Sequence, residues 1–183
     1  MTIIGVAGSL RKNSFNAGLL RAAAEAVSAE THLEILSIRD VPLYDADVEE
    51  TTGVPASVQY IKDKVAAADG LLLVTPEYNN SIPGVFKNVI DWMSRPPADV
   101  PRIFRDRPVA IMGATPGMGG TFLAQNAWLP VIRTLQMRAW FGGRLHVSGA
   151  RQAFDAEGNL TDEKIRAQLK TFMAGFEAFI RAK

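Results

Sequence analysis

The chain has 183 residues, of which 48% are hydrophobic and 21% charged, a balance that suits one globular domain with a full core. Its net charge of +1 creates no overall field that would attract nucleic acid or an acidic membrane. The chain has no cysteine, which excludes disulfides, thiolate metal sites and thiol nucleophiles, and is consistent with a reducing compartment.

Targeting signals are not apparent in the sequence. The apolar run at residues 3–7 begins at once and is far too short for the core of a signal peptide. No apolar stretch approaches the ~20 residues that are needed to span a bilayer. We therefore expect a cytoplasmic protein with neither a membrane nor a nucleic acid as partner.

Short apolar runs alternate with segments of helical periodicity along the whole chain. The apolar runs predict strands at residues 3–7, 33–38, 71–75 and 109–113, and a fifth strand at 138–141 or 145–147. The periodic segments predict helices at residues 16–29, 58–68, 84–94, 120–135 and 162–182. We expect Pro130 to bend the fourth helix, Thr161 to cap the last one, and the acidic stretch after Pro42 to be a loop. This alternation predicts a parallel sheet covered by helices on both faces.

Three strand-to-helix loops carry unusual chemistry. We name them loop one (residues 8–15), loop two (residues 76–83) and loop three (residues 114–119). In open α/β sheets, ligands bind beyond the carboxyl ends of the strands, where the strand order reverses. If the strand order is 2-1-3-4-5, the first, third and fourth strands are neighbours, and these three loops would line one cleft.

Loop one has the composition of a phosphate-binding loop. Gly8 permits a tight turn, Ser9, Ser14 and Asn16 offer short polar side chains, and Arg11 can bind a phosphate bidentately. The N–H groups that open the next helix point to the same place. An ordinary helix cap would explain one hydroxyl, but not two hydroxyls and an arginine. The spacing excludes both the dinucleotide fingerprint and the nucleoside triphosphate loop.

Loops two and three add features that suit a planar ligand. In loop two, Tyr78 offers a ring and Asn79 an amide, although Tyr78 could simply pack and Asn79 simply turn the chain. Loop three contains Gly117 and Gly119, so its backbone can approach a ligand closely. The interpretation of each loop as part of a ligand site is stronger because both loops lie at the carboxyl edge of the predicted sheet.

A cluster of arginines precedes the fourth strand and allows two interpretations. Arg95, Arg102, Arg105 and Arg107 fall within one short stretch. They could belong to a solvated loop, or they could receive an anionic substrate such as a nicotinamide dinucleotide phosphate.

Three segments together resemble one known family. They are Gly8-Ser9-Leu10-Arg11-x-x-Ser14-x-Asn16, the run Pro-Glu-Tyr-Asn-x-Ser-x-Pro-Gly-x-x-Lys-Asn-x-x-Asp-Trp at 76–92, and the tail at 154–163. They closely resemble the NADPH-dependent FMN reductase family, which includes bacterial quinone and chromate reductases and related azoreductases. The resemblance implies a flavodoxin-like fold over residues 1–183, a three-layer sandwich around a five-stranded parallel sheet in the order 2-1-3-4-5.

The resemblance also implies roles for individual residues, carried over by position. The FMN phosphate would be held by Ser9, Arg11, Ser14, Phe15 and Asn16. The isoalloxazine ring would be cradled by Pro76, Glu77, Tyr78 and Asn79, and its pyrimidine side would be bordered by Thr115, Gly117 and Gly119. The helix with Asn88, Asp91 and Trp92 resembles the family's dimer-forming helix, although simple core packing would also explain its apolar residues.

The implied activity is an FMN-dependent NAD(P)H oxidoreductase. It would pass hydride from NADPH, or NADH, through bound FMN to a quinone, an azo compound, a metal oxyanion such as chromate, or free flavin. No side chain need act as acid or base, and no metal is expected. The two histidines, His32 and His146, are expected at strand-side or surface positions. The implied assembly is a homodimer or homotetramer.

The main alternative is a non-enzymatic electron carrier like flavodoxin. Such carriers are usually strongly acidic, whereas this chain is nearly neutral. A receiver-type signalling domain would need an aspartate at the end of the third strand, where this chain has Thr75-Pro76-Glu77. A serine hydrolase is disfavoured because the chain has no G-x-S-x-G elbow.

Overall fold

The strands of the computed structural model, which describes residues 1–182, form a parallel sheet in the order β2-β1-β3-β4-β5. The strands are β1 (Thr2–Ala7), β2 (His32–Leu36), β3 (Gly70–Val74), β4 (Pro108–Ala114) and β5 (Arg138–Ala139). A further short strand, β6 (His146–Val147), pairs with the end of β4. The strand order confirms the flavodoxin-like fold class.

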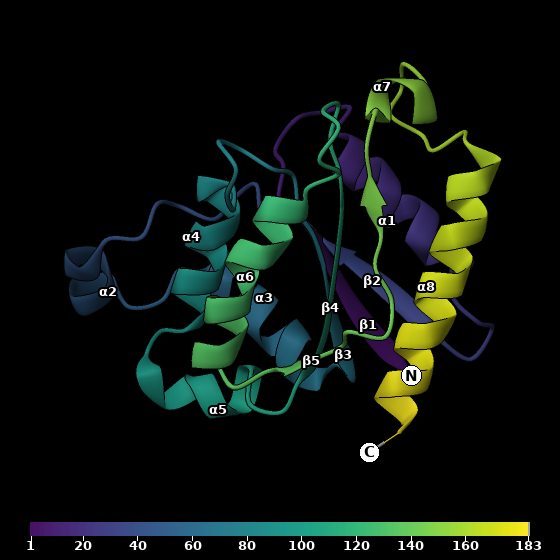
Figure 1. Ribbon diagram of the computed structural model, residues 1–183. Helices are drawn as coiled ribbons and strands as arrows, with labels where there is room; N and C mark the ends of the chain where they lie inside the picture. The colour runs from purple at the N-terminus through teal and green to yellow at the C-terminus, as the bar shows by residue number, and fades with distance from the viewer. Residues whose placement is uncertain (183) are drawn as a thin grey trace.

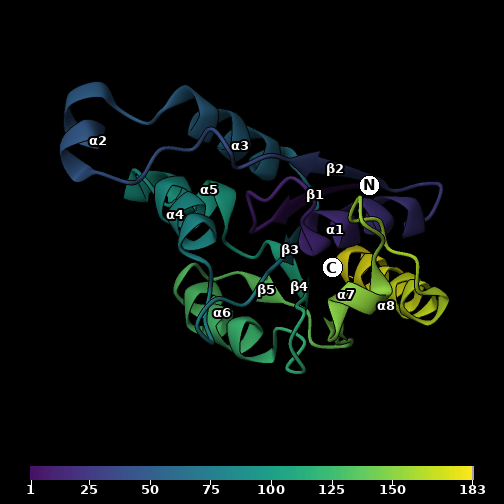
Figure 2. The same ribbon diagram turned by 90° about the horizontal axis from the view of Figure 1, so that it is seen from above.

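Helices cover both faces of the sheet (Figures 1 and 2). One face packs against α1 (Phe15–Ala26), α7 (Ala150–Ala153) and α8 (Glu163–Arg181). The other face packs against α3 (Ala56–Ala67), α4 (Gly84–Met93), α5 (Val100–Ile103) and α6 (Phe122–Thr134). A 3-10 turn (Pro97–Asp99) precedes α5, and α2 (Ala46–Thr52) projects away from the sheet in both views.

The central strand β3 is apolar throughout its length. All five of its residues are buried, because both faces of the sheet are covered. Leu71 and Leu73 pack into the core that contains Trp128, whereas Leu72 and Val74 pack into the core of α1 and α8. Alternate side chains of one strand therefore hold both helical layers.

Four details differ from the sequence-based expectations. Both candidate positions of the fifth strand are used, because β5 and β6 each pair with β4. The acidic stretch contains α2, whose first turn is capped by the Asp45 carboxylate. The last helix is capped by Asp162, which accepts from the N–H of Ile165, and not by Thr161. The short helices α5 and α7 were not expected.

One buried side chain joins the start of α1 to the end of β4. The amide of Asn16 donates from Nδ2 to the Ala114 carbonyl and accepts at Oδ1 from the Ala114 N–H, both at 2.8 Å. Asn16 is only 4% exposed, so water cannot replace these bonds. This pair, which we call the Asn16 clamp, fixes loop one beside loop three.

We predict that Asn16→Ala lowers the free energy of unfolding by about 2–4 kcal/mol, because it leaves two buried backbone groups of Ala114 unpaired. Urea unfolding measures this change. The matched control is Asn126→Ala on the exposed surface of α6, which should change stability by less than about 0.5 kcal/mol. Equal effects of the two variants would contradict the role of the clamp.

Candidate functional site

The three loops meet at the carboxyl edge of the sheet, the upper edge in Figure 1, and enclose one pocket. We call it the loop pocket. Its lining residues come from all three loops and the start of α1: Ser9, Arg11, Ser14, Phe15, Asn16, Pro76, Glu77, Tyr78, Ala114, Thr115 and Pro116. Its cavity of about 70 Å³ is smaller than a whole cofactor site, so it is the enclosed end of a larger surface.

Most of the residues that were expected at an FMN site line this pocket. Asn79, Gly117 and Gly119 do not, although they belong to the same loops. The pocket also includes Ala114 and Pro116, which the sequence analysis missed. Their only sequence signal is their position on either side of Thr115.

The start of α1 supplies free hydrogen-bond donors. Ser14 is the N-cap, and its Oγ accepts from the N–H of Ala17. Among the described residues, none accepts a hydrogen bond from the N–H groups of Phe15 and Asn16. Because the side chain of Asn16 is used in the Asn16 clamp, this residue can serve a ligand only through its backbone N–H. These donors at a helix N-terminus suit an anion.

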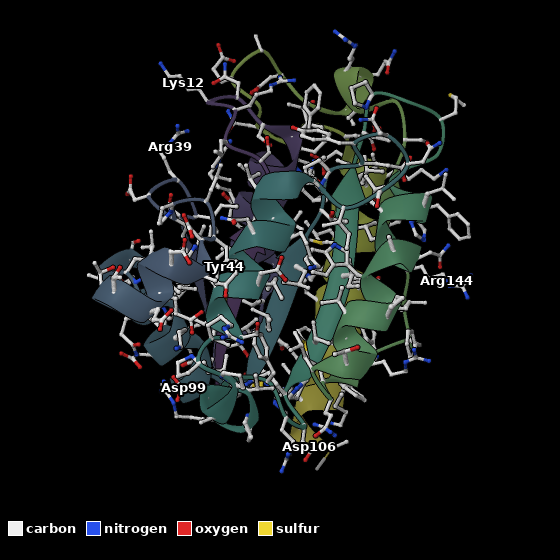
Figure 3. The ribbon with its side chains drawn as sticks, turned by 90° about the vertical axis from the view of Figure 1, so that its left-hand side faces the viewer. Lys12, Arg39, Tyr44, Asp99, Asp106 and Arg144 are labelled. Carbon is white, nitrogen blue, oxygen red and sulfur yellow. The ribbon has the colours of Figure 1, made fainter. Side chains whose placement is uncertain are left out.

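Arg11 stands over the rim of the loop pocket. Its guanidinium lies 5.5 Å from the centre of the Phe15 ring and makes one hydrogen bond, at 3.3 Å, to the Asn13 carbonyl. The loop beneath it is held by Arg39, which donates to the Leu10 carbonyl at 2.6 Å. Figure 3 shows Lys12 and Arg39 projecting at this upper edge. Most donors of Arg11 therefore stay available to a phosphate.

Loop two is a tight hairpin. Tyr78 and Ser81 exchange two backbone hydrogen bonds, at 3.1 and 3.0 Å, around the pair Asn79 and Asn80. Both asparagines have positive φ, 50° and 60°, as a type I′ turn requires and asparagine tolerates. The hairpin leaves the Tyr78 side chain half exposed at the pocket rim, where its ring offers a flat surface.

Glu77 acts as a structural link between loop two and α6. Its carboxylate accepts at 3.0 Å from the N–H of Ala124 in the first turn of α6. The N-cap residue itself, Thr121, makes no side-chain cap and has a φ of 68°. Glu77 therefore caps this helix from another loop, which holds loops two and three together.

The arginine cluster at 95–107 lies away from the site. Its last members lead into the start of β4, at the opposite edge of the sheet, where α5 lies in Figure 1. Arg95 pairs with Glu49 at 2.8 Å, and Arg102 pairs with Asp63 at 3.1 Å. Arg105 and Arg107 hydrogen-bond to Gln136 and to backbone carbonyls. These side chains have partners within the protein, which favours the interpretation as a solvated segment over that as a nucleotide contact.

The two histidines lie outside the loop pocket, as expected. His32 begins β2, and His146 begins β6 beside α6. Burial lowers the pKa of His146 below its ordinary value, which favours the neutral imidazole. Within residues 1–182, no group of three or more histidine, aspartate or glutamate side chains is placed to hold a metal ion.

The donor set fits a nucleotide with one phosphate and a planar ring. The N-terminus of α1 and Arg11 suit the phosphate, and the Tyr78 hairpin with loop three suits the ring. On a flavodoxin-like sheet, such an edge is typical of a protein that binds flavin mononucleotide. The family model of NADPH-dependent FMN reductase matches residues 1–152. The chain belongs to this family, and FMN and NAD(P)H are its expected cofactors.

Comparisons with individual proteins agree with the family. The chain is 37% identical over 179 residues to an NAD(P)H-dependent FMN reductase of Pseudomonas aeruginosa, covering 98% of this chain and 95% of that protein. It is 36% identical over 181 residues to a 2-hydroxy-1,4-benzoquinone reductase of a Burkholderia species, covering 99% of this chain and 97% of that protein. The solved structure of a flavoenzyme, the NAD(P)H:acceptor oxidoreductase of Paracoccus denitrificans, matches with a TM-score of 0.87 at 31% identity. The match covers 99% of this chain and 97% of that chain.

Two residues of α4, the helix that resembles the family's dimer-forming helix, have hydrogen-bond partners within the chain. Asn88 Nδ2 and Trp92 Nε1 both donate to the Pro42 carbonyl, at 2.8 and 3.0 Å, and Asn88 Oδ1 accepts from the N–H of Tyr44. They therefore attach the segment that leads to α2 to the outer side of α4. Trp92 is fully buried, so the core-packing interpretation of this residue is confirmed.

We predict that Arg11→Ala weakens FMN binding by roughly 2–5 kcal/mol, the range for removing one partner of a desolvated charge pair. Because Arg11 is exposed before a ligand binds, we expect the lower end of that range. Titration of the apo-protein with FMN measures the change. Lys12→Ala removes a neighbouring charge that does not line the loop pocket, and should leave the affinity nearly unchanged. Unaltered affinity of the Arg11 variant would remove this residue from the phosphate site.

Proposed function

We propose that residues 1–183 form one FMN-binding domain that transfers reducing equivalents from NADPH or NADH to a quinone. The observation that carries this proposal is the meeting of loops one, two and three around free donors at the start of α1. The names of the relatives support the acceptor class, since the Burkholderia relative is a benzoquinone reductase. The proposed cofactor-binding residues are the twelve that the resemblance implies, with Asn16 acting through its backbone.

The chain's own residues would bind and orient rather than exchange protons. Bound FMN would supply the hydride and electron chemistry. The N–H groups of Phe15 and Asn16, with the Ser14 hydroxyl and Arg11, would hold the phosphate. The loop-two hairpin would present the Tyr78 ring and the N–H groups of its turn to the flavin ring. Glu77 would keep loop three at a fixed distance from that hairpin.

Other acceptors belong to the same proposal. Azo compounds, chromate and free flavin accept electrons from reduced flavin without a dedicated acid or base in the protein. The open rim, where Tyr78 and Met118 are exposed, favours an acceptor that approaches from solvent. We rank quinones first, because their flat rings match a flat surface.

We propose a homodimer or homotetramer as the working assembly. The segment from Pro42 to α2 projects from the body of the protein (Figures 1 and 2), and Leu43 at its base is 79% exposed. An exposed apolar side chain on a projecting segment is typical of a contact surface. Sedimentation velocity would distinguish these assemblies from a monomer.

We predict that the FMN-loaded protein oxidises NADPH continuously when a benzoquinone is added, with a turnover number of about 1 s⁻¹ or more. Absorbance at the reduced nicotinamide band measures the rate, and azo dye, chromate and free FMN are compared as acceptors. An electron carrier like flavodoxin would show negligible turnover without a partner reductase, and that result would overturn the proposed enzyme. The visible absorbance of bound flavin, recorded before each assay, controls for loss of cofactor.

A further inference from the structure

The carboxyl edge of the sheet contains an arginine whose side chain has no partner among residues 1–182. Arg151 lies on α7, beside loop one at the upper edge in Figure 1. It is exposed, and it makes neither a hydrogen bond nor an ion pair with any residue in the range 1–182. The arginines of the 95–107 cluster, in contrast, are all engaged at the opposite edge. A substrate anion that approaches this edge would therefore meet Arg151.

Arg151 and Arg11 both line a second hollow, which we call the arginine pocket. Its cavity is about 350 Å³, and both guanidinium-bearing residues line it. Arg11 and Phe15 also line the loop pocket, so the two hollows are adjacent. The far wall is fixed to loop one by a hydrogen bond at 2.9 Å from Asn13 Nδ2 to the Ala156 carbonyl.

The walls of the arginine pocket combine aromatic and charged groups. The rings of Phe15 and Phe154 lie 5.3 Å apart, and they give the pocket an apolar side. Asp155 is the acidic residue of the lining, and hydrogen bonds from the Asn159 N–H and amide hold the pKa of its carboxyl below the ordinary value. Two guanidinium groups against one carboxylate leave the pocket with a net positive charge.

NADPH and NADH differ only in the 2′-phosphate on the adenosine ribose. A site distinguishes them when a cation meets that phosphate, and arginine does so with paired, charge-assisted hydrogen bonds. An adenine ring needs an apolar or aromatic surface, which the half-buried Phe15 ring, packed against the buried Phe154 ring, offers. The arginine pocket has both features, and it adjoins the pocket that we assign to FMN.

We propose that the arginine pocket receives the adenosine end of NADPH, with Arg151 binding the 2′-phosphate, so that the protein prefers NADPH to NADH. This inference rests on the proposed function, because it needs a nicotinamide nucleotide as electron donor. Arg11 lines both pockets, so its charge acts on the FMN phosphate in the loop pocket and on the 2′-phosphate of NADPH in the arginine pocket. Of the two arginines, Arg151 lines the arginine pocket and not the loop pocket.

The test compares Arg151→Ala with the unaltered, FMN-loaded protein in steady-state assays. We expect the KM for NADPH to rise about tenfold, and the KM for NADH to stay within about twofold, because only NADPH carries the phosphate that Arg151 would bind. Arg151→Lys should recover part of the preference, since it keeps the charge and loses the planar fork. Because the exposed Arg151 side chain makes no hydrogen bond or ion pair within residues 1–182, these variants should fold normally.

Arg144→Ala is the matched control. Arg144 is another exposed arginine, and Figure 3 shows it projecting from the segment that follows β5, far from Lys12 in loop one. Its removal changes the net charge by the same amount without altering the arginine pocket. If Arg144→Ala raised the KM for NADPH as much as Arg151→Ala, the preference would come from general attraction and the proposal would fail.

Calorimetry separates failure of this proposal from failure of the proposed function. Adenosine 2′,5′-bisphosphate should bind the FMN-loaded protein about tenfold more tightly than adenosine 5′-monophosphate, and Arg151→Ala should abolish the difference. This measurement requires no turnover. Equal binding of the two nucleotides, or equal KM values for NADPH and NADH in the unaltered protein, would overturn the inference. Absence of turnover with either donor would instead overturn the proposed function.

Discussion

The Asn16 clamp is the contact on which the site depends. The amide of one buried side chain pairs with both backbone groups of Ala114 at 2.8 Å, as a neighbouring strand would. It therefore fixes the N-terminus of α1 against the end of β4. The unpaired N–H groups of Phe15 and Asn16 then face the same pocket as Thr115. Because such a pair is hard to replace by water, the pocket is formed before any ligand arrives.

The two edges of the sheet differ in whether their cationic side chains are paired with carboxylates. At the amino edge, Arg102 and the buried Lys62 are paired with carboxylates, and Lys62 Nζ lies 2.7 Å from Asp99. At the carboxyl edge, Arg11 and Arg151 keep their guanidinium groups open. A protein with a net charge of only +1 can thus attract anions to one edge by leaving a few cations there unpaired.

The fold could be predicted largely from sequence, because apolar runs and helical periodicity report burial directly. Loop one was recognisable because its donors are adjacent in the chain. The role of the Asn16 side chain could not be recognised from the sequence, because an asparagine near the start of a helix also fits a cap. Its partner, Ala114, is 98 positions away. The sequence left two interpretations of the arginine cluster open because the partners of these arginines, such as Glu49, come from other elements. Arg151 carries no local signal, because only the fold brings it to the same hollow as Arg11.

The central claim is that the three loops form an FMN site whose cofactor NAD(P)H can reduce. The most direct measurement is the absorption spectrum of the protein after incubation with FMN and removal of the excess, followed by anaerobic addition of NADPH. The account predicts bound flavin in about one equivalent per chain, as one site requires, and bleaching of its visible bands. A colourless protein that takes up no FMN would contradict the account, and so would bound flavin that neither NADPH nor NADH bleaches.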